Sequence, residues 1–187
     1  MSERRIEVAA IVGSLRRNSY NRGLLRTAML LRPDRIHLYE VPIHDLPYYN
    51  EDYERRGFPA VVGEYRAQLD RADALLICTP EYAYSIPGVL KNALDWTVRP
   101  VQQSPVRGKA MAIMGASMGR SGTMRAQLHL RQLAVPLGML PVPEPEVYIT
   151  FAADKFNQLG ELTDHTSREL VAEMMENLAD WTELLRG

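Results

Sequence analysis

The fold is decided by the stretch Ile6-Glu-Val-Ala-Ala-Ile-Val-Gly-Ser-Leu-Arg-Arg-Asn-Ser-Tyr-Asn21. Its first seven residues are apolar apart from Glu7, which is typical of a strand buried on both faces of a parallel sheet. Gly13 ends this run, and apolar residues at helical spacing follow as far as Leu31. The stretch therefore predicts a strand, a short polar loop and a helix in direct succession.

The same alternation continues along the chain. Further strands are expected at residues 35–41, 74–79, 109–115 and 146–150. Further helices are expected at residues 59–72, 87–98, 123–137 and 163–185. Residues 42–58 contain three tyrosines and two prolines and predict a long irregular loop. The pattern predicts an α/β fold, a doubly wound five-stranded parallel sheet with helices on both faces, in a single domain of residues 1–187.

Composition excludes several classes of protein. The chain has 187 residues and a formal net charge of −1, so no nucleic-acid partner is expected, because such partners require a basic face. Cys78 is the one cysteine and lies in an apolar run, so we expect a buried small hydrophobe and no disulfide framework. No apolar run is long enough for a membrane span, and the first residues make a poor signal peptide. We therefore expect a cytoplasmic protein with no membrane partner.

Three loops follow the strands of the predicted sheet, at residues 13–21, 79–87 and 115–122. In open parallel sheets, ligands bind outside the carboxyl ends of the strands near a switch point in strand order. We therefore expect the functional site where these three loops meet.

The first loop has the chemistry of a phosphate site. It supplies hydroxyls at Ser14 and Ser19, an amide at Asn21 and a guanidinium at Arg16, and it opens into a helix whose N-terminal N–H groups favour an anion. It matches neither G-x-G-x-x-G nor G-x-x-x-x-G-K-[ST], which disfavours a dinucleotide or triphosphate. A single phosphate is predicted; the alternative is a serine-capped helix start with solvated arginines.

The second loop reads Thr79-Pro-Glu-Tyr-Ala-Tyr-Ser-Ile-Pro87. Prolines at both ends stiffen it, and Tyr82 and Tyr84 offer faces for a planar ligand. The alternative is an ordinary aromatic turn that packs on a neighbouring element.

The third loop reads Gly115-Ala-Ser-Met-Gly-Arg-Ser-Gly122. Its glycines allow backbone N–H groups to approach the polar edge of a ring. It also matches G-x-S-x-G, which leaves a serine hydrolase with Ser117 as nucleophile and Asp164 and His165 downstream as a less favoured alternative. Only 70 residues follow Ser117, and no HGGG-like segment precedes it. The remaining histidines show no metal-ligand spacing, so no metal site is expected.

Together the three loops resemble the NADPH-dependent FMN reductase family, the flavodoxin-like group that includes chromate and quinone reductases. The first carrying segment is the phosphate loop quoted above. The second is Pro80-Glu-Tyr-Ala-Tyr-Ser-Ile-Pro-Gly-Val-Leu-Lys-Asn-Ala-Leu-Asp-Trp96. The third is Gly108-Lys-Ala-Met-Ala-Ile-Met-Gly-Ala-Ser-Met-Gly-Arg-Ser-Gly-Thr-Met-Arg-Ala-Gln127. The tail from residue 156 to the last helix also resembles the family, so the resemblance spans nearly the whole chain.

The resemblance implies a flavodoxin-like sheet of order 2-1-3-4-5 with FMN at the switch point. The phosphate would be held by Ser14, Arg16, Ser19 and Asn21. One side of the flavin ring would be bordered by Pro80, Glu81, Tyr82 and Ala83, and the other by Ser117, Gly119 and Gly122.

The implied activity is that of an FMN-dependent NAD(P)H oxidoreductase. Hydride would pass from NADPH or NADH through FMN to a small-molecule acceptor such as a quinone, an azo compound, a metal oxyanion or free flavin. Because the flavin carries the chemistry, no catalytic acid, base or nucleophile is expected. A flavodoxin-type electron carrier without its own NAD(P)H reaction is the other alternative, although such carriers are usually strongly acidic.

Two features concern substrates and assembly. Relatives usually have Asn where this chain has Ala83, and often smaller residues where it has Met118 and Arg120; we hypothesise that Arg120 attracts an anionic substrate or the phosphate of NADPH. The resemblance also implies a homodimer or homotetramer that the helix at 88–96, with Leu90, Leu94 and Trp96, helps to form; the alternative is that these side chains simply pack on the sheet. A second chain would then cover the flavin mouth, together with the 42–58 loop.

Overall fold

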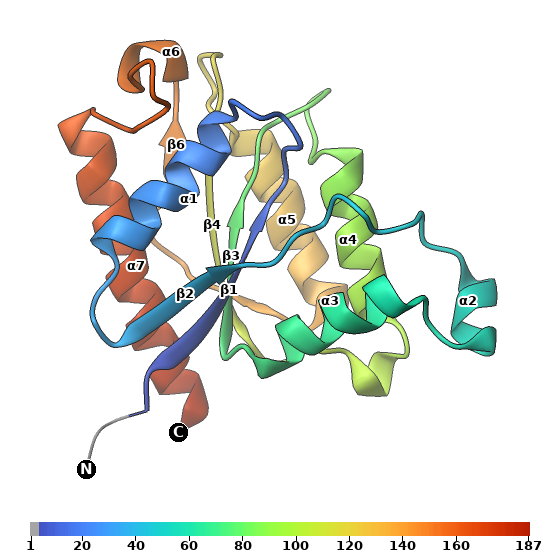
Figure 1. The fold of residues 1–187 in the computed structure, drawn as a ribbon. Helices are drawn as coiled ribbons and strands as arrows, with labels where there is room; N and C mark the ends of the chain where they lie inside the picture. The colour runs from blue at the N-terminus through green and yellow to red at the C-terminus, as the bar shows by residue number, and fades with distance from the viewer. Residues whose placement is uncertain (1–3) are drawn as a thin grey trace.

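The first apolar run forms the centre of the sheet in the computed structural model, which describes residues 4–187. Strand β1 (Ile6–Val12) lies between β2 (Ile36–Glu40) and β3 (Ala74–Cys78), and β4 (Ala110–Ala116) follows β3. All pairs are parallel, in the order β2-β1-β3-β4-β5 (Figure 1). The predicted flavodoxin-like architecture and strand order are confirmed.

Two short strands share the fifth position, where a single strand at 146–150 was predicted. β5 (Leu140–Pro141) pairs with the beginning of β4, and β6 (Val147–Ile149) pairs with its end. Pro143 and Pro145 lie between them, and proline has no N–H to donate to a sheet. The proline-rich connection therefore interrupts pairing in the middle of this edge.

The helices cover both faces of the sheet. α1 (Tyr20–Leu31) and α7 (His165–Arg186) pack together on one face. α3 (Ala60–Arg71), α4 (Gly88–Val98) and α5 (Met124–Leu137) cover the other (Figure 1). A 3₁₀ turn (Val101–Gln103) and α6 (Ala152–Lys155) are short elements in the connections. Within residues 4–187, no helix combines the length and apolar character needed to cross a membrane.

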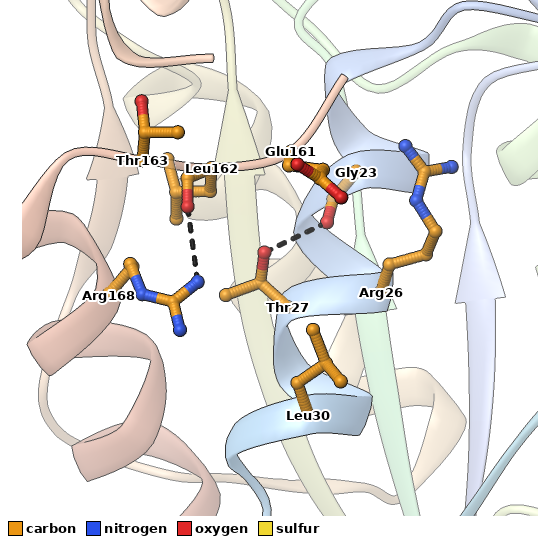
Figure 2. A pocket seen from close by; sticks show the side chains of 8 residues that line it. All are labelled: Gly23, Arg26, Thr27, Leu30, Glu161, Leu162, Thr163 and Arg168. Atoms are coloured by element: carbon orange, nitrogen blue, oxygen red, sulfur yellow. Dashed lines mark hydrogen bonds between the residues drawn. The ribbon is translucent and has the colours of Figure 1, made fainter. Parts of the chain in front are cut away.

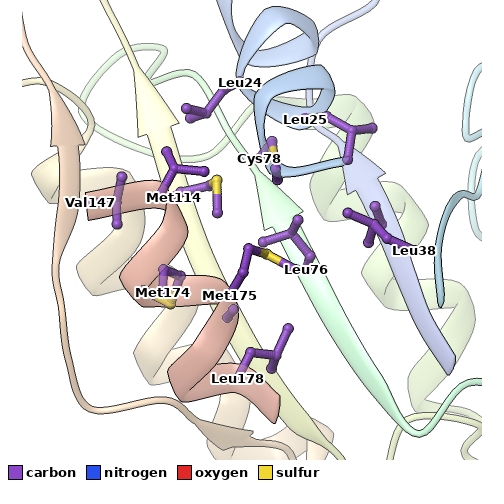
Figure 3. Packing of buried hydrophobic residues seen from close by; sticks show 14 of the residues in the cluster. Leu24, Leu25, Leu38, Leu76, Cys78, Met114, Val147, Met174, Met175 and Leu178 are labelled. Carbon is purple, nitrogen blue, oxygen red and sulfur yellow. The ribbon is translucent and has the colours of Figure 1, made fainter. Parts of the chain in front are cut away.

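Alternate residues of each strand point to opposite faces of the sheet and pack into two separate hydrophobic cores, one on each face. On the α1–α7 face, Leu76 and Met114 of the sheet pack with Leu24 and Met174 (Figure 3). Cys78 is fully buried in the same cluster, and burial raises the pKa of its thiol. The sequence-based view of Cys78 as a buried hydrophobe is therefore confirmed, and it offers no thiolate for chemistry.

The segment 42–58 is more ordered than predicted. It contains α2 (Glu51–Arg56), whose first turn is capped by Asn50. The indole N–H of Trp96 donates to Pro47 O at 2.8 Å, and the rings of Tyr49 and Phe58 meet Trp96 edge-on. The segment is therefore packed against α4 of its own chain.

Gly115 shows how closely the strand ends approach one another at the carboxyl edge of the sheet. A Cβ atom built on it would overlap the side-chain oxygen of Thr123 and the carbonyl oxygen of Thr79. Glycine is required here because β4 must pass both neighbours before it enters the third loop.

We predict that Gly115→Ala lowers the free energy of unfolding by about 3 kcal/mol, because the added methyl overlaps backbone that cannot move away. Gly63→Ala is the matched control. Gly63 lies inside α3 with open space around it, so the same methyl should raise stability by about 0.5–1 kcal/mol. Chemical denaturation measures both, and equal effects of the two substitutions would contradict the close approach.

Candidate functional site

Three loops meet at the carboxyl edge of the sheet, at the top of Figure 1. Backbone hydrogen bonds link them at the strand ends: Gly13 N donates to Cys78 O at 2.9 Å, and Thr79 N donates to Met114 O at 3.0 Å. The segments after β1, β3 and β4 therefore start side by side, as the sequence predicted.

The first loop leaves its hydroxyls unused. Ser14 and Ser19 are only 3% and 6% exposed, yet neither hydroxyl has a hydrogen-bond partner within residues 4–187. Ser19 stands at the N-cap of α1 without making the capping bond, and the first turn has no acidic residue. The alternative of a serine-capped helix start is therefore wrong. The uncapped N–H groups and the free hydroxyls together make a place for an anion.

Arg16 is exposed beside this site. Its guanidinium donates to Asn18 O at 3.3 Å, within the same loop. The remaining N–H groups of Arg16 point to no carboxylate within residues 4–187, so the side chain is free to turn toward a ligand.

The side-chain amide of Asn21, predicted to bind phosphate, is hydrogen-bonded to another part of the fold. Its Nδ2 donates to Ala116 O and its Oδ1 accepts from Ala116 N, both at 2.9 Å, and the residue is 2% exposed. The amide that was expected to bind phosphate is thus engaged on both sides. Asn21 instead ties the start of α1 to the end of β4, across β3.

The second loop forms a tight hairpin turn with a strained backbone. Tyr82 N donates to Ser85 O and Ser85 N to Tyr82 O, both at 2.9 Å. Ala83 and Tyr84 between them have φ of 47° and 63°, the pattern of a type I′ turn, which favours Asn-Gly. Such conformations cost about 1–2 kcal/mol for each residue that has a side chain.

The strained turn is fastened to α5. The carboxylate of Glu81 accepts from two backbone N–H groups at the start of that helix, at 3.0 and 3.3 Å, and from the Arg125 guanidinium at 2.9 Å. Arg125 also lies over the Tyr84 ring, 4.2 Å from its centroid, and Ser85 Oγ lies 2.8 Å from His129 Nδ1. Glu81 therefore caps α5, and its carboxylate is not available to a ligand. Around it, Pro80 is buried while Tyr82 is 48% exposed.

In the third loop, the side chain of Ser117 forms hydrogen bonds with the backbone of the same loop. Its hydroxyl donates to Gly122 O and accepts from Gly119 N at 3.3 Å. Gly122 has a φ of 58°, and a Cβ there would lie 3.1 Å from that of Tyr148, so only glycine fits. Gly119 is exposed with open space where a side chain would stand, while its N–H donates to Ser117 Oγ and its carbonyl oxygen accepts from Gly122 N and Phe151 N.

The serine hydrolase arrangement is not assembled. His165 pairs with Glu169 at 3.2 Å, and the carboxylate of Asp164 caps α7 by accepting from Ser167 N at 2.9 Å. The hydrogen bonds from Ser167 hold the pKa of Asp164 below its ordinary value. Because Ser117 is bonded only to loop backbone within residues 4–187, it has no base to activate it. The same residues contain no cluster able to hold a metal ion.

A cavity of about 370 Å³ beside the first loop was not predicted. It lies between the start of α1 and a turn at 157–160 far along the chain, and Arg17 and Arg26 line it together with Arg16 and Ser19. The signal in the sequence is Gly23, in the first turn of α1. A Cβ there would overlap Gly160 O, so the glycine marks a close approach of another segment.

A second cavity, of about 450 Å³, continues along α1 toward α7 (Figure 2). Its polar groups satisfy one another: Thr27 Oγ1 donates to Gly23 O at 3.1 Å and Arg168 donates to Leu162 O at 3.2 Å. It also contains the carboxylate of Glu161. This cavity shares Arg26 with the cavity at the first loop but, unlike that cavity, has an acidic side chain in its lining.

The apolar side chains of α4 do not form a surface for a partner. Leu90, Leu94 and Trp96 are each no more than 1% exposed and belong to the core on their face of the sheet. An interface through this helix cannot use them, and the alternative that they pack on the sheet is confirmed.

Comparison with known proteins gives consistent matches. Residues 6–154 match the NADPH-dependent FMN reductase family. The chain is 48% identical to an NAD(P)H-dependent FMN reductase of Pseudomonas aeruginosa over 182 residues, 97% of this chain and 98% of that protein. It is 40% identical to a 2-hydroxy-1,4-benzoquinone reductase of a Burkholderia species, over 94% of this chain and 96% of that protein. The structure of the flavoenzyme NAD(P)H:(acceptor) oxidoreductase FerB of Paracoccus denitrificans superimposes with a TM-score of 0.87 at 34% identity, covering 96% of this chain and 98% of FerB.

We predict that Ala83→Asn raises the free energy of unfolding by about 1 kcal/mol, because asparagine tolerates a positive φ better than alanine does. Ala60→Asn, at the exposed start of α3, is the control and should give no gain, since its backbone is helical. Denaturant titration of both variants measures the difference. Loss of stability in Ala83→Asn would show that the turn is not strained.

Proposed function

Because the chain belongs to the NADPH-dependent FMN reductase family, it is an NAD(P)H-dependent oxidoreductase with FMN as its cofactor, and we propose that its acceptor is a quinone. When bound, FMN supplies a ring that takes hydride from the nicotinamide and gives it to the acceptor. The observation that carries the site assignment is that Ser14 and Ser19, only 3% and 6% exposed at an uncapped helix start, leave their hydroxyls without a hydrogen-bond partner within residues 4–187.

The phosphate of FMN fits the first loop. The free hydroxyls of Ser14 and Ser19 would donate hydrogen bonds to the phosphate, and the unpaired N–H groups at the start of α1 would add backbone donors. Arg16 would add a charge-assisted hydrogen bond from the exposed side. Asn21 would act through its bonds to Ala116, by holding the phosphate loop at a constant distance from the third loop.

The flavin ring fits between the second and third loops. Pro80, Tyr82 and Ala83 would border one side, and the exposed Gly119, which has no side chain to obstruct a ring, the other. Glu81 and Ser117 would position these two loops, Glu81 through α5 and Ser117 through its bond to Gly122 O. Both loops are therefore built before a ligand arrives, which lowers the entropy lost on binding.

A quinone suits the exposed surface around this site. Tyr82, Tyr84 and Met118 are between 48% and 70% exposed and offer flat or apolar contacts for an aromatic acceptor. The Burkholderia relative is a reductase of 2-hydroxy-1,4-benzoquinone. The overall reaction converts NAD(P)H, a proton and the quinone into NAD(P)⁺ and the hydroquinone.

A homodimer or homotetramer in the cytoplasm completes the proposal. Met124 and Leu128 are 44% and 48% exposed, one turn apart on α5, next to the exposed Tyr84 turn. Burial of this apolar surface by a second copy would explain its composition. The reduced thiol of Cys78 and the use of NAD(P)H suit a cytoplasmic protein. Sedimentation equilibrium measures the mass of the assembly.

We predict that Ser14→Ala and Ser19→Ala each raise the Kd of FMN about tenfold, because each removes a hydrogen bond to a charged phosphate. Titration of the FMN-free protein, followed by quenching of flavin fluorescence, measures the Kd. Ser104→Ala is the control, because its buried hydroxyl also lacks a partner among residues 4–187 but lies outside the three loops. An unchanged Kd of FMN in both loop variants would show that this loop does not bind the phosphate.

A further inference from the structure

The cavity of about 370 Å³ at the start of α1 has an unusual lining. One wall is the end of the first loop and the beginning of α1, and the opposite wall is the turn at 157–160. The lining residues are Arg16, Arg17, Asn18, Ser19, Tyr20, Arg26, Asn157, Gln158, Leu159 and Gly160. Three arginines thus face one space, and none of the lining residues is acidic.

None of these arginines is neutralised by an ion pair with residues 4–187. Arg16 and Arg26 donate only to backbone carbonyls, Asn18 O at 3.3 Å and Gly160 O at 2.8 Å, and Arg17 is exposed without a partner in the same range. The neighbouring acid is Glu161, which lines the second cavity and accepts from Asn157 Nδ2 at 2.8 Å. The first cavity is therefore a concentration of positive charge with unused N–H donors, which suits a phosphate group.

The far wall of the cavity is built rigidly. Asn157 Oδ1 accepts from the backbone N–H groups of Leu159 and Glu161, both at 3.0 Å. Gly160 has a φ of 72°, and a Cβ there would lie 3.0 Å from the Arg26 guanidinium, so glycine lets Arg26 reach the turn. Gly23 lets the turn lie directly on α1. Arg26 is thus held in place without a ligand, which reduces the entropic cost of using it.

Charge suggests a second phosphate-bearing ligand. FMN has one phosphate, for which Ser14, Ser19, Arg16 and the start of α1 already provide donors. Arg17 and Arg26 line the cavity as well and are not needed for that phosphate. The other ligand of the reaction, the nicotinamide dinucleotide, carries a pyrophosphate and, in NADPH, a 2′-phosphate, and its nicotinamide must reach the same flavin.

We propose that Arg17 and Arg26, the two arginines of this cavity that are not assigned to the phosphate of FMN, bind a phosphate group of the nicotinamide dinucleotide. This inference rests on the function proposed above. It places dinucleotide recognition on the α1 side of the site, away from Arg120, which is exposed in the third loop.

The test uses the FMN-loaded enzyme with Arg17→Gln and Arg26→Gln. Calorimetric titration with adenosine 2′,5′-bisphosphate and with ADP measures binding directly, and KM values for NADPH and NADH are measured alongside. Each variant should raise the Kd of a phosphate-bearing fragment and the matching KM about tenfold, with the FMN content per chain and the KM for benzoquinone unchanged. Arg56→Gln, an exposed change on α2, is the control and should alter none of these values.

The pattern across ligands identifies which phosphate is bound. If the variants bind only adenosine 2′,5′-bisphosphate and NADPH more weakly, the arginines hold the 2′-phosphate. If they bind ADP and NADH more weakly to the same extent, the arginines hold the pyrophosphate. Either result supports the proposal. Unchanged values for all four ligands overturn it, as does loss of FMN from the variants or an effect seen in Arg120→Gln instead.

A folding defect would be recognised, because Arg17 makes no side-chain hydrogen bond or ion pair within residues 4–187 that its replacement would break, and the melting temperature checks Arg26→Gln. A wild-type protein that takes up no FMN would instead contradict the proposed function itself.

Discussion

The site depends on one buried side chain. Asn21 donates to and accepts from the backbone of Ala116, residues that lie 95 positions apart in the chain. These two hydrogen bonds join the start of α1 to the end of β4 and so hold the first and third loops on either side of β3. Without the amide, the N–H and carbonyl of Ala116 would be left buried without this partner, at a cost of about 1–3 kcal/mol each. The separation between the phosphate end and the ring end of the site is thus a property of the folded chain.

Around this tie, the second loop holds a strained turn and the first loop leaves two serine hydroxyls without partners within residues 4–187, while the sheet beneath is fully packed. Ala83 and Tyr84 hold positive φ values because Glu81, Arg125 and His129 fasten their turn to α5. Local strain of this kind persists only where the surroundings determine the conformation. The hydroxyls of Ser14 and Ser19 are likewise left without partners. A preformed, polar site with free donors on a rigid scaffold is what binding of a large charged cofactor requires.

Much of the fold could be predicted because the signals are local or shared with a family. The apolar runs of β1, β3 and β4 and the glycine and proline residues that end them appear directly in the sequence, and the strand order implied by the family resemblance is confirmed. The division of the fifth position into β5 and β6 was missed because the run at 146–150 shows only the second piece, whereas pairing depends on where prolines withdraw N–H groups. α2 was missed because prolines and tyrosines surround a helix of only six residues.

The site was predictable in its location more than in its roles. Residue types identified Ser14 and Ser19, whose hydroxyls stay free, and these remain predictions as phosphate ligands. Asn21 and Glu81 have equally suitable chemistry, but partners 95 and 44 residues away take up their polar groups, and no local pattern reveals such pairs. The turn at 157–160 lacks any motif that would connect it with the first loop. The most direct test of the whole account is the visible spectrum of the purified protein without oxygen, recorded before and after NADPH and again after benzoquinone. The account predicts a yellow protein that NADPH bleaches and the quinone restores; a protein that cannot take up FMN, or a bound flavin that neither NADPH nor NADH bleaches, would contradict it.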